Sequence, residues 1–466
     1  MSKHLLPLAA ALALAGCTSM APKYERPAAP VAPGFTSEAT SSGTRAASEI
    51  EWQSYFADER LKRLIEVALK NNRDLRVAVL NIEQARATYG IRRADQWPTV
   101  NLGATGTRGP SAATGNISTL YTVGLQVTAY ELDLFGRVRS LSDAALAQYL
   151  GTEEGRKAAQ ISLISSVATT YLALIADDEL LGLTRETLKT REESLKLAKL
   201  KFDNGASSEL DFRLNESLLE AARVTLAQFT RQRALDENAL TLLLGQAVPS
   251  DLPPPLAMSE QRLAVDLPSG LPSEVLTRRP DVRQAEQQLI AANANIGAAR
   301  ANFFPRISLT ASAGTASSEL SGLFKSGSAA WSFAPQIVLP IFDAGRNKAN
   351  LDVAQVNRDI AVAQYEKSIQ SAFREVQDAL AGRATLGEQA RAQLAQANAE
   401  QVRFRLADLR YKNGAASYLD VLDAQRSLFA SQQAVVQVQA AQVQNLVTLY
   451  KVLGGGWLEP TLTQPK

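Results

Sequence analysis

The sequence predicts a mixed fold in which very long α-helices are combined with four membrane-crossing β-strands, arranged as two internal repeats. Three observations support this fold class. The segment from Tyr411 to Asp420 restates the segment from Phe202 to Asp211, 209 positions upstream. Four stretches of about ten residues alternate apolar with small or polar side chains. Residues 137–201 contain no proline and keep a helical composition throughout.

The first 16 residues predict an export signal. A short basic start precedes the apolar run from Leu5 to Leu14, which is too short to cross a bilayer as a helix. Leu14-Ala15-Gly16-Cys17 resembles a bacterial lipobox, which predicts lipidation of Cys17, the only cysteine in the chain. Thr18 in the following position favours the outer membrane. Residues 17–50, rich in Pro, Ala, Ser and Thr, are expected to form an extended lipidated tether.

Composition argues against several classes of function. Forty-nine basic and forty-seven acidic residues leave a formal net charge of +2, without the basic runs that follow nucleic-acid backbones. The single histidine, His4, is expected to leave with the signal, so no nucleophilic triad and no His/Cys metal site can form. Phosphate-binding and dinucleotide-binding glycine motifs are missing from the sequence. We therefore expect no enzyme activity, no cofactor, no metal and no nucleic-acid partner.

The first repeat is predicted to span residues 51–245. Helical periodicity begins at Leu61 and resumes over residues 74–94. The period changes to two after Trp97-Pro98, which predicts a β-hairpin over residues 98–132. One long helix then runs to Lys201, and a second returns over residues 210–245.

The second repeat is predicted to span residues 271–454, after a proline-rich linker over residues 246–270. Its β-hairpin covers residues 305–340, and residues 455–466 form a C-terminal tail. Pro335 and Pro340 weaken its second strand as a fully paired one. The repeats are offset by 207 residues through the hairpin to Leu134-Phe135, and the insertion Asp343-Ala344 then raises the offset to 209.

Two equivalent turns join the long helices. In each turn a glycine can take the left-handed conformation that ends a helix, and a serine three residues before an aspartate has the capping-box spacing. The paired positions are Gly205 and Gly414, Ser208 and Ser417, and Asp211 and Asp420. Each aspartate could serve as a helix cap or as part of a carboxylate ring lining a pore, and the sequence leaves both open.

Four strands cannot close a transmembrane barrel, because the free edges would present unpaired backbone groups to lipid. Three copies of the chain would supply twelve strands and an approximately six-fold ring. The chain must therefore assemble, and twelve strands would enclose a lumen that the long helices continue as a tunnel.

The chain resembles the OprM-type outer-membrane factors of the TolC superfamily, the lipoprotein exit ducts of tripartite RND drug-efflux pumps (the NodT/RND efflux outer-membrane channel family). The motifs that carry the resemblance are Asn72-Arg73-Asp74-Leu75-Arg76, Glu131-Leu132-Asp133-Leu134-Phe135-Gly136-Arg137, Ala299-Arg300-Ala301-Asn302-Phe303-Phe304-Pro305, Leu422-Asp423-Ala424-Gln425-Arg426-Ser427-Leu428-Phe429 and Leu453-Gly454-Gly455-Gly456-Trp457. This resemblance implies a TolC-like homotrimer with a β-barrel in the outer membrane of a Gram-negative bacterium and an α-barrel in the periplasm. It also implies two protein partners, a periplasmic adaptor (membrane fusion protein) and an inner-membrane RND transporter, together with contact to outer-membrane lipid.

The resemblance further places a periplasmic gate on Tyr411, Leu419, Asp423 and Arg426. Asp423 and Arg426 lie three residues apart on one helix face and could pair within or between chains. Their counterparts in the first repeat are Leu214 and Ser217, so this pair belongs to the second turn alone. An ordinary surface ion pair is the alternative interpretation.

The function expected from the resemblance is that of an exit duct conducting drugs and small toxic compounds. Two alternatives remain open. A duct for type I protein secretion or metal efflux would share the architecture, although only three methionines argue weakly against a dedicated copper or silver route. A structural coiled-coil lipoprotein would explain the long helices, but it would not explain four alternating strands.

Overall fold

A computed structural model describes residues 19–35, 47–110, 115–261, 263 and 273–457. The predicted signal peptide, Cys17 and most of the predicted C-terminal tail lie outside the described residues. Within the described part, the chain separates into two compact units, each containing segments of both sequence repeats. Unit 1 comprises Met1–Ala29, Leu80–Glu154 and Arg283–Ser368, and unit 2 comprises Pro30–Val79, Gly155–Val282 and Ile369–Lys466.

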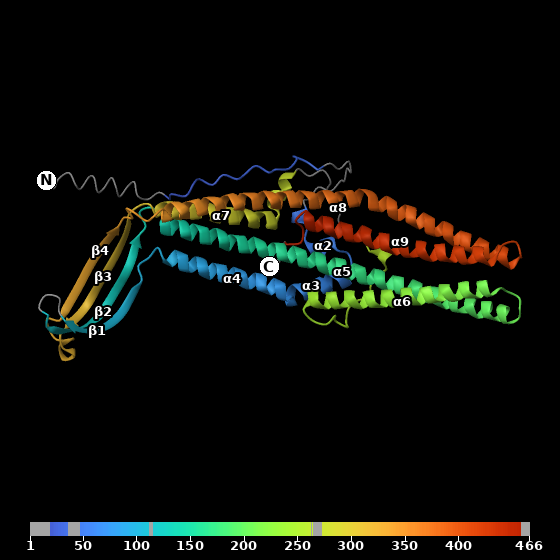
Figure 1. Ribbon diagram of the computed structural model, residues 1–466, viewed down its shortest axis with the longest axis horizontal. Helices are drawn as coiled ribbons and strands as arrows, with labels where there is room; N and C mark the ends of the chain where they lie inside the picture. Colours follow the sequence, from blue (N-terminus) through green and yellow to red (C-terminus); the bar gives the residue numbers. More distant parts are fainter. Residues whose placement is uncertain (1–18, 36–46, 111–114, 262, 264–272, 458–466) are drawn as a thin grey trace, which may run out of the picture. The chain divides into compact units, whose positions relative to one another are not determined.

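The described elements follow the order helix, hairpin, long helix pair, repeated twice (Figure 1). The α-helices are α2 (Trp52–Tyr55), α3 (Glu59–Asn71), α4 (Arg73–Ala94), α5 (Arg137–Asp203), α6 (Glu209–Leu244), α7 (Pro280–Ala301), α8 (Arg346–Lys412) and α9 (Tyr418–Val452). The strands are β1 (Val100–Pro110), β2 (Ile117–Leu132), β3 (Arg306–Ser317) and β4 (Ala329–Val338). Short 3-10 turns are η1 (Ala47–Glu49), η2 (Met258–Glu260), η3 (Ser273–Arg278) and η4 (Leu320–Gly322). Helices and strands predicted from periodicity fall within about two residues of these bounds, which is the usual uncertainty of element ends.

Unit 1 contains one antiparallel sheet in the order β1-β2-β3-β4. Val100 pairs with Val127 and Leu102 with Leu125, and the register shifts between Val127 and Tyr130, where Ala129 has a positive φ of 52°. The shift is a β-bulge, which bends the strand. β1 and β4 are the two edges of this four-stranded sheet.

The two faces of the sheet differ in chemistry. Residues opposite one another in the register share a face, so Leu102, Leu125 and Trp331 lie on one side, joined across the strands by Ala313. This face is exposed in the single chain, with Leu102 77% and Trp331 80% accessible. The opposite face carries small and polar side chains. There the hydroxyls of Thr105 and Thr122 hydrogen-bond at 2.7 Å, and those of Ser312 and Ser332 at 2.8 Å.

Pro335 lies inside β4, opposite Leu309. The sequence suggested that Pro335 and Pro340 would weaken this strand. Pro340 follows the strand, and β4 pairs with β3 from Val338 to Ala329 through Pro335. An edge strand tolerates a proline because one side of its backbone has no partner within the sheet.

The segment Ser19–Arg26, which we call the strap, lies against α7 in unit 1. Glu286 receives three hydrogen bonds from it, one from the Tyr24 hydroxyl at 2.9 Å and two from the Arg26 guanidinium at 2.7 and 2.9 Å. Burial and the bond to Glu286 raise the pKa of the Tyr24 hydroxyl. One carboxylate of α7 therefore holds two strap side chains.

Further contacts of the strap use its backbone. Asn293 donates to the carbonyl oxygen of Pro22 at 2.7 Å, and Arg300 donates to that of Met20 at 3.2 Å. Gly297 lies under the strap, where a Cβ atom would stand only 2.6 Å from the backbone nitrogen of Ala21. The sequence predicted an extended tether here because the segment has few apolar residues. Its contact with α7 was not predicted, because that contact is made by polar side chains and backbone carbonyl groups.

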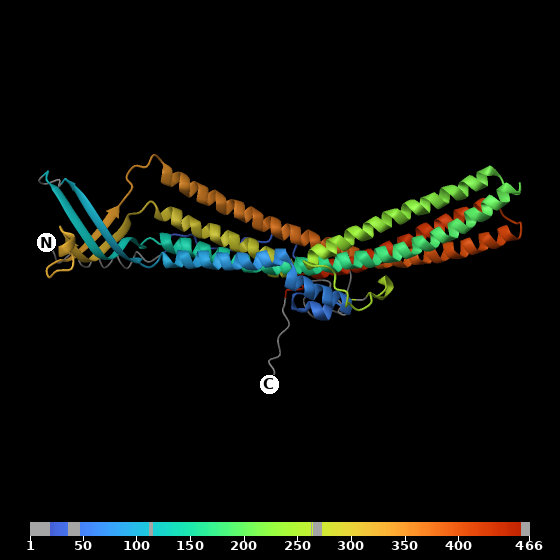
Figure 2. The same ribbon diagram turned by 90° about the horizontal axis from the view of Figure 1, so that it is seen from below.

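Unit 2 contains the outer parts of two helical hairpins, α5–α6 and α8–α9, whose turns lie beside one another (Figure 2). Its core includes the stacked rings of Tyr55 and Tyr450, 3.9 Å apart, both buried. Asp58 caps α3 by accepting from the backbone of Arg60 and Leu61, and it also accepts from the Tyr171 hydroxyl at 2.9 Å. These contacts tie α3, α5 and α9 together at the base of the hairpins.

A stretch of α5 is long and apolar enough to cross a membrane by length and composition alone, and 56% of it is buried against the rest of the protein. Buried residues of this helix in unit 2 include Ile164, Val167, Ala168 and Leu172. The apolar stretch is accounted for by packing inside the bundle, as in a core helix.

Candidate functional site at the helix tips

Both helix tips use the same turn. Gly205 and Gly414 each have φ of 71°, the left-handed conformation expected from the sequence. In the second tip Gly414 donates to the carbonyl of Tyr411 at 2.9 Å and Ala415 donates to that of Arg410 at 2.8 Å. The first tip repeats this pair of bonds. The pattern is a Schellman motif, which satisfies the last carbonyl groups of α5 and α8.

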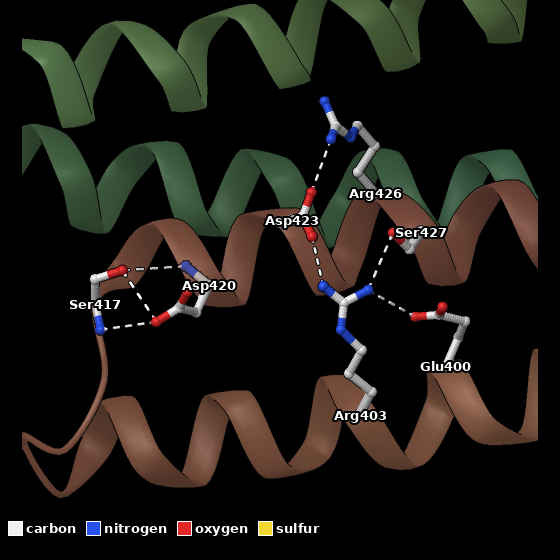
Figure 3. Close-up of polar contacts among 7 residues, drawn as sticks. All are labelled: Glu400, Arg403, Ser417, Asp420, Asp423, Arg426 and Ser427. Carbon is white, nitrogen blue, oxygen red and sulfur yellow. Dashed lines mark hydrogen bonds and ion pairs between the residues drawn. The ribbon is translucent and has the colours of Figure 1, made fainter.

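Both predicted capping boxes are present. Ser208 accepts a hydrogen bond from the backbone of Asp211 at 3.2 Å, and Ser417 accepts from that of Asp420 at 3.3 Å. Each aspartate carboxylate in turn accepts from the backbone of its serine, and Figure 3 shows this for Ser417 and Asp420. The carboxylates of Asp211 and Asp420 are therefore engaged at the N-termini of α6 and α9, where negative charge is stabilised.

The second tip carries a charged cluster centred on Asp423 (Figure 3). One carboxylate oxygen accepts from Arg426 at 2.7 Å, and the other accepts from Arg403 of α8 at 2.5 Å. Arg403 also contacts Glu400 at 3.1 Å and the hydroxyl of Ser427 at 3.4 Å. We call these five residues the tip cluster. It joins α8 to α9 about ten residues from the turn.

Arg403 holds the pKa of Asp423 below its usual range, and Arg426 contributes in the same direction. The carboxylate therefore stays ionised at neutral pH. The pair Asp423–Arg426 that the sequence suggested forms within one chain, and the structure adds Arg403. Arg403 lies ten residues before Asn413, and Asp423 lies ten residues after it. Such positions face each other in an antiparallel hairpin, so this equal spacing could have identified Arg403 as the partner of Asp423.

A second set of contacts connects the two hairpins. Lys201, at the end of α5, donates to the hydroxyl of Tyr411 at 2.7 Å, and the Tyr411 and Tyr418 rings lie 4.9 Å apart. The Tyr418 hydroxyl donates to the side-chain oxygen of Asn215 on α6 at 3.0 Å. Tyr411, expected at the constriction, thus touches the first hairpin directly. Leu419, also expected there, is 57% exposed.

The first tip has a different arrangement. Phe202 and Phe212 stack with their ring centroids 5.7 Å apart. Arg213 pairs with Glu209 at 3.3 Å and with Glu216 at 2.8 Å, so this tip also carries charge, next to the positions Leu214 and Ser217 compared in the sequence. All of these ion pairs lie within α6, whereas the pair Arg403–Asp423 bridges two helices.

Within the described residues, no group of three or more His, Cys, Asp or Glu side chains is arranged to hold a metal ion. What the tips present is a set of reversible polar contacts between helices. Such contacts can be exchanged when the helices move.

Comparison with known proteins assigns the family. A family profile described as "Outer membrane efflux protein" matches residues 64–246 and 271–455. The chain belongs to the outer membrane efflux protein family. The two matched segments overlap the two predicted repeats, although the first match begins at residue 64 rather than at residue 51.

Relatives of this efflux protein agree with the assignment. It is 52% identical to the solvent efflux pump outer membrane protein SrpC of Pseudomonas putida, covering 97% of this chain and 98% of that protein. It is 47% identical to the outer membrane protein OprJ of Pseudomonas aeruginosa, covering 96% and 95%. The open-state structure of the MtrE outer membrane channel of Neisseria gonorrhoeae superposes with a TM-score of 0.86 at 44% identity, covering 94% and 99%. The chain is thus an outer-membrane efflux channel with a TolC-like fold, and its family is one of channels rather than enzymes.

Proposed function

We propose that three copies of this efflux protein form a closed duct, with a twelve-stranded β-barrel in the outer membrane and an α-helical barrel in the periplasm. The observation that supports this most directly is the sheet of unit 1. It has four strands, two free edges and one exposed apolar face. In lipid, free edges would leave backbone N–H and C=O groups unpaired, so β4 of one copy is expected to pair with β1 of the next.

Strand lengths fit this assembly. β1 has 11 residues and β4 has 10, which is the length that crosses a bilayer obliquely. The face with Leu102, Leu125 and Trp331 would meet lipid, and the face with the Thr and Ser hydroxyl pairs would line the lumen.

Exposed apolar side chains on opposite sides of the sheet in unit 1 support a head-to-tail interface between copies. On α4, which precedes β1, Leu80 and Ile91 are exposed. On α8, which follows β4, Val353, Val356 and Ile360 are exposed. A heterologous contact that closes into a ring would bury both sets at once.

The tips would form the periplasmic gate. In the resting duct the constriction would lie at Tyr411, Leu419, Asp423 and Arg426, held by the tip cluster and by the Lys201–Tyr411 bond. Docking of a periplasmic adaptor would separate these contacts, and an inner-membrane RND transporter would supply the cargo. Lipid attachment at Cys17 would add a membrane anchor at the N-terminus.

The relatives suggest the cargo. SrpC is named as a solvent efflux protein, another relative is named as a toluene efflux protein and another as an antibiotic efflux protein. We infer that this chain passes small apolar toxic compounds and drugs. Susceptibility of a deletion strain to solvents and antibiotics tests this cargo, and unchanged susceptibility with a defect in protein secretion or metal tolerance would favour the other duct classes.

Adjacent residues of β4 provide a matched test of the barrel. Trp331→Lys places a charge on the proposed lipid face, which costs about 2–4 kcal/mol near the bilayer midplane. Ser332→Lys places the same charge on the proposed lumen face and should be tolerated. We expect Trp331→Lys to lose the heat-modifiable trimer on gels and the channel conductance in planar bilayers, while Ser332→Lys keeps both. Equal behaviour of the two variants would contradict the proposed orientation of the sheet.

A further inference from the structure

A buried carboxyl group lies between the two helices of the first hairpin. Asp177 of α5 is only 6% exposed, and its Oδ2 atom is buried without a hydrogen-bond partner among the described residues. Asp236 of α6 is the neighbouring carboxyl group, and after burial it is the main cause that raises the pKa of Asp177. Two carboxyl groups can hydrogen-bond to each other only when one of them carries a proton.

Among the described residues no ion pair joins Asp177 to a cation. Arg233 of α6, the cation that acts on the pKa of Asp177, donates to Asp178 at 2.5 Å and to Glu237 at 2.8 Å. Gln232 donates to Oδ2 of Asp236 at 3.2 Å. Asp177 is the more buried partner, so the proton is placed on it.

The other elements near Asp177 supply no compensating charge. α9 contacts α5 on both sides of this position, through Gln444 with Thr169 and through Phe429 with Arg191. Between Phe429 and Gln444 it carries no charged residue. On α5 itself Glu179 faces the η2 segment, where it accepts from the backbone of Met258 at 2.8 Å. The groups that act on Asp177 are thus Asp178, Arg233 and Asp236.

We propose that Asp177 and Asp236 form a proton-sensitive contact between α5 and α6. One shared proton holds the helices together, and its loss places two like charges at a buried interface and loosens the first hairpin. This contact lies within unit 2 of a single chain, so it requires neither an assembled duct nor an adaptor.

Burial and the hydrogen bond to Asp236 raise the pKa of Asp177 to about 7, from an ordinary value of 3.8. A raised pKa for an acid means that the packed hairpin binds the proton more tightly than the loosened one. The shared proton contributes its full stabilisation to the packed hairpin below about pH 4. This contribution decreases as the pH rises and is lost above about pH 7. Within this window the balance between packed and loosened hairpin shifts by up to about tenfold per pH unit.

Hydrogen exchange in the purified full-length protein tests the proposal. Exchange of the α5 amides around Asp177 and the α6 amides around Asp236 is measured by mass spectrometry between about pH 5 and about pH 8, corrected for the intrinsic chemical rate. In the parent protein the corrected exchange should rise with pH up to about pH 7. Asp177→Asn mimics the protonated group and should remove this rise.

Glu186→Gln is the control, because Glu186 is an exposed carboxylate of α5 that is not among the groups acting on Asp177. It should keep the pH response. The proposal is overturned if Asp177→Asn responds to pH as the parent does, or if Glu186→Gln also abolishes the response.

Infrared difference spectra of the unsubstituted protein provide a measurement that does not depend on a variant folding. A protonated carboxyl band that disappears as the pH passes through about 7 supports the proposal, because ordinary carboxyl groups are ionised well below that pH. If no carboxyl band titrates in that range, the shared proton does not exist.

Discussion

Arg403 and Asp423 lie ten residues on either side of Asn413 and form an ion pair of 2.5 Å across the α8–α9 hairpin. The equal spacing places them opposite one another in an antiparallel hairpin. In the first hairpin the partners of Arg213 lie on its own helix, and an ion pair between the helices, Arg223 with Glu192, is longer at 3.9 Å and lies farther from the turn. A close bridge at this position in only one of the two repeated tips is a reason to test that tip for a role in gating.

Removing the tip cluster should open the channel. We expect the double variant Asp423→Ala with Arg426→Ala, and separately Arg403→Ala, to raise single-channel conductance in planar bilayers severalfold, because the contact that holds α9 against α8 is lost. Arg213→Ala at the first tip removes a comparable exposed arginine with two acidic partners and should leave conductance unchanged. If the double variant conducts like the parent, the gate is not at the second tip.

Acidification should weaken the same cluster. The pKa of Asp423 is held below its ordinary value by Arg403 and Arg426, so the ion pair stabilises the folded tip above the unfolded pKa and this contribution is lost as the pH falls through the folded pKa. Conductance should therefore rise only below about pH 4. Asp423→Asn should conduct at neutral pH as the parent does in acid. A parent channel whose conductance stays flat on acidification contradicts the prediction.

Glu286→Gln should release the strap. The substitution removes the charge that receives three hydrogen bonds from Tyr24 and Arg26, while leaving the size of the side chain almost unchanged. We expect trypsin to cleave after Lys23 about tenfold faster, as a hydrogen bond to a charged group contributes roughly the corresponding free energy. Glu83→Gln, on an exposed position of α4 in the same unit, is the control and should cleave at the parental rate. Equal cleavage of all three proteins would show that Glu286 does not hold the strap.

The tip glycines should be intolerant of a side chain. Gly205→Ala and Gly414→Ala force alanine into the left-handed conformation, at a cost of about 1–2 kcal/mol each, which thermal unfolding would register as a lower Tm. Gly182→Ala is the matched control, since this exposed helical glycine of α5 has open space around it and should become more stable by about 0.5–1 kcal/mol. Tip variants as stable as the parent would mean that the turns can refold around alanine.

Local signals in the sequence were sufficient for the elements and for both tips. Period-two alternation located the four strands, and the Asn-Gly and Ser-x-x-Asp spacing predicted turns and capping boxes that the structure contains. These features depend on residues within four positions of each other, so periodicity and capping rules describe them directly.

Contacts between distant segments could not be obtained in this way. Arg403 joins Asp423 and Lys201 joins Tyr411 across separate helices, and Glu286 holds residues more than 250 positions away. Such pairs depend on how the helices pack against one another. A single sequence contains no local pattern from which this packing can be predicted. Asp177 was overlooked for the same reason, since its burial and its partner follow only from the position of α6 against α5.

Pro335 has a consequence for a copy that has not yet assembled. A proline cannot donate a backbone hydrogen bond, so β4 offers an interrupted ladder at the edge of its sheet. A continuous edge would serve as a template for almost any extended chain, and therefore for aggregation. An edge with a gap at a fixed position accepts a partner strand best in a register that accommodates the gap. In the proposed assembly, the proline would therefore discourage wrong pairings before the ring closes.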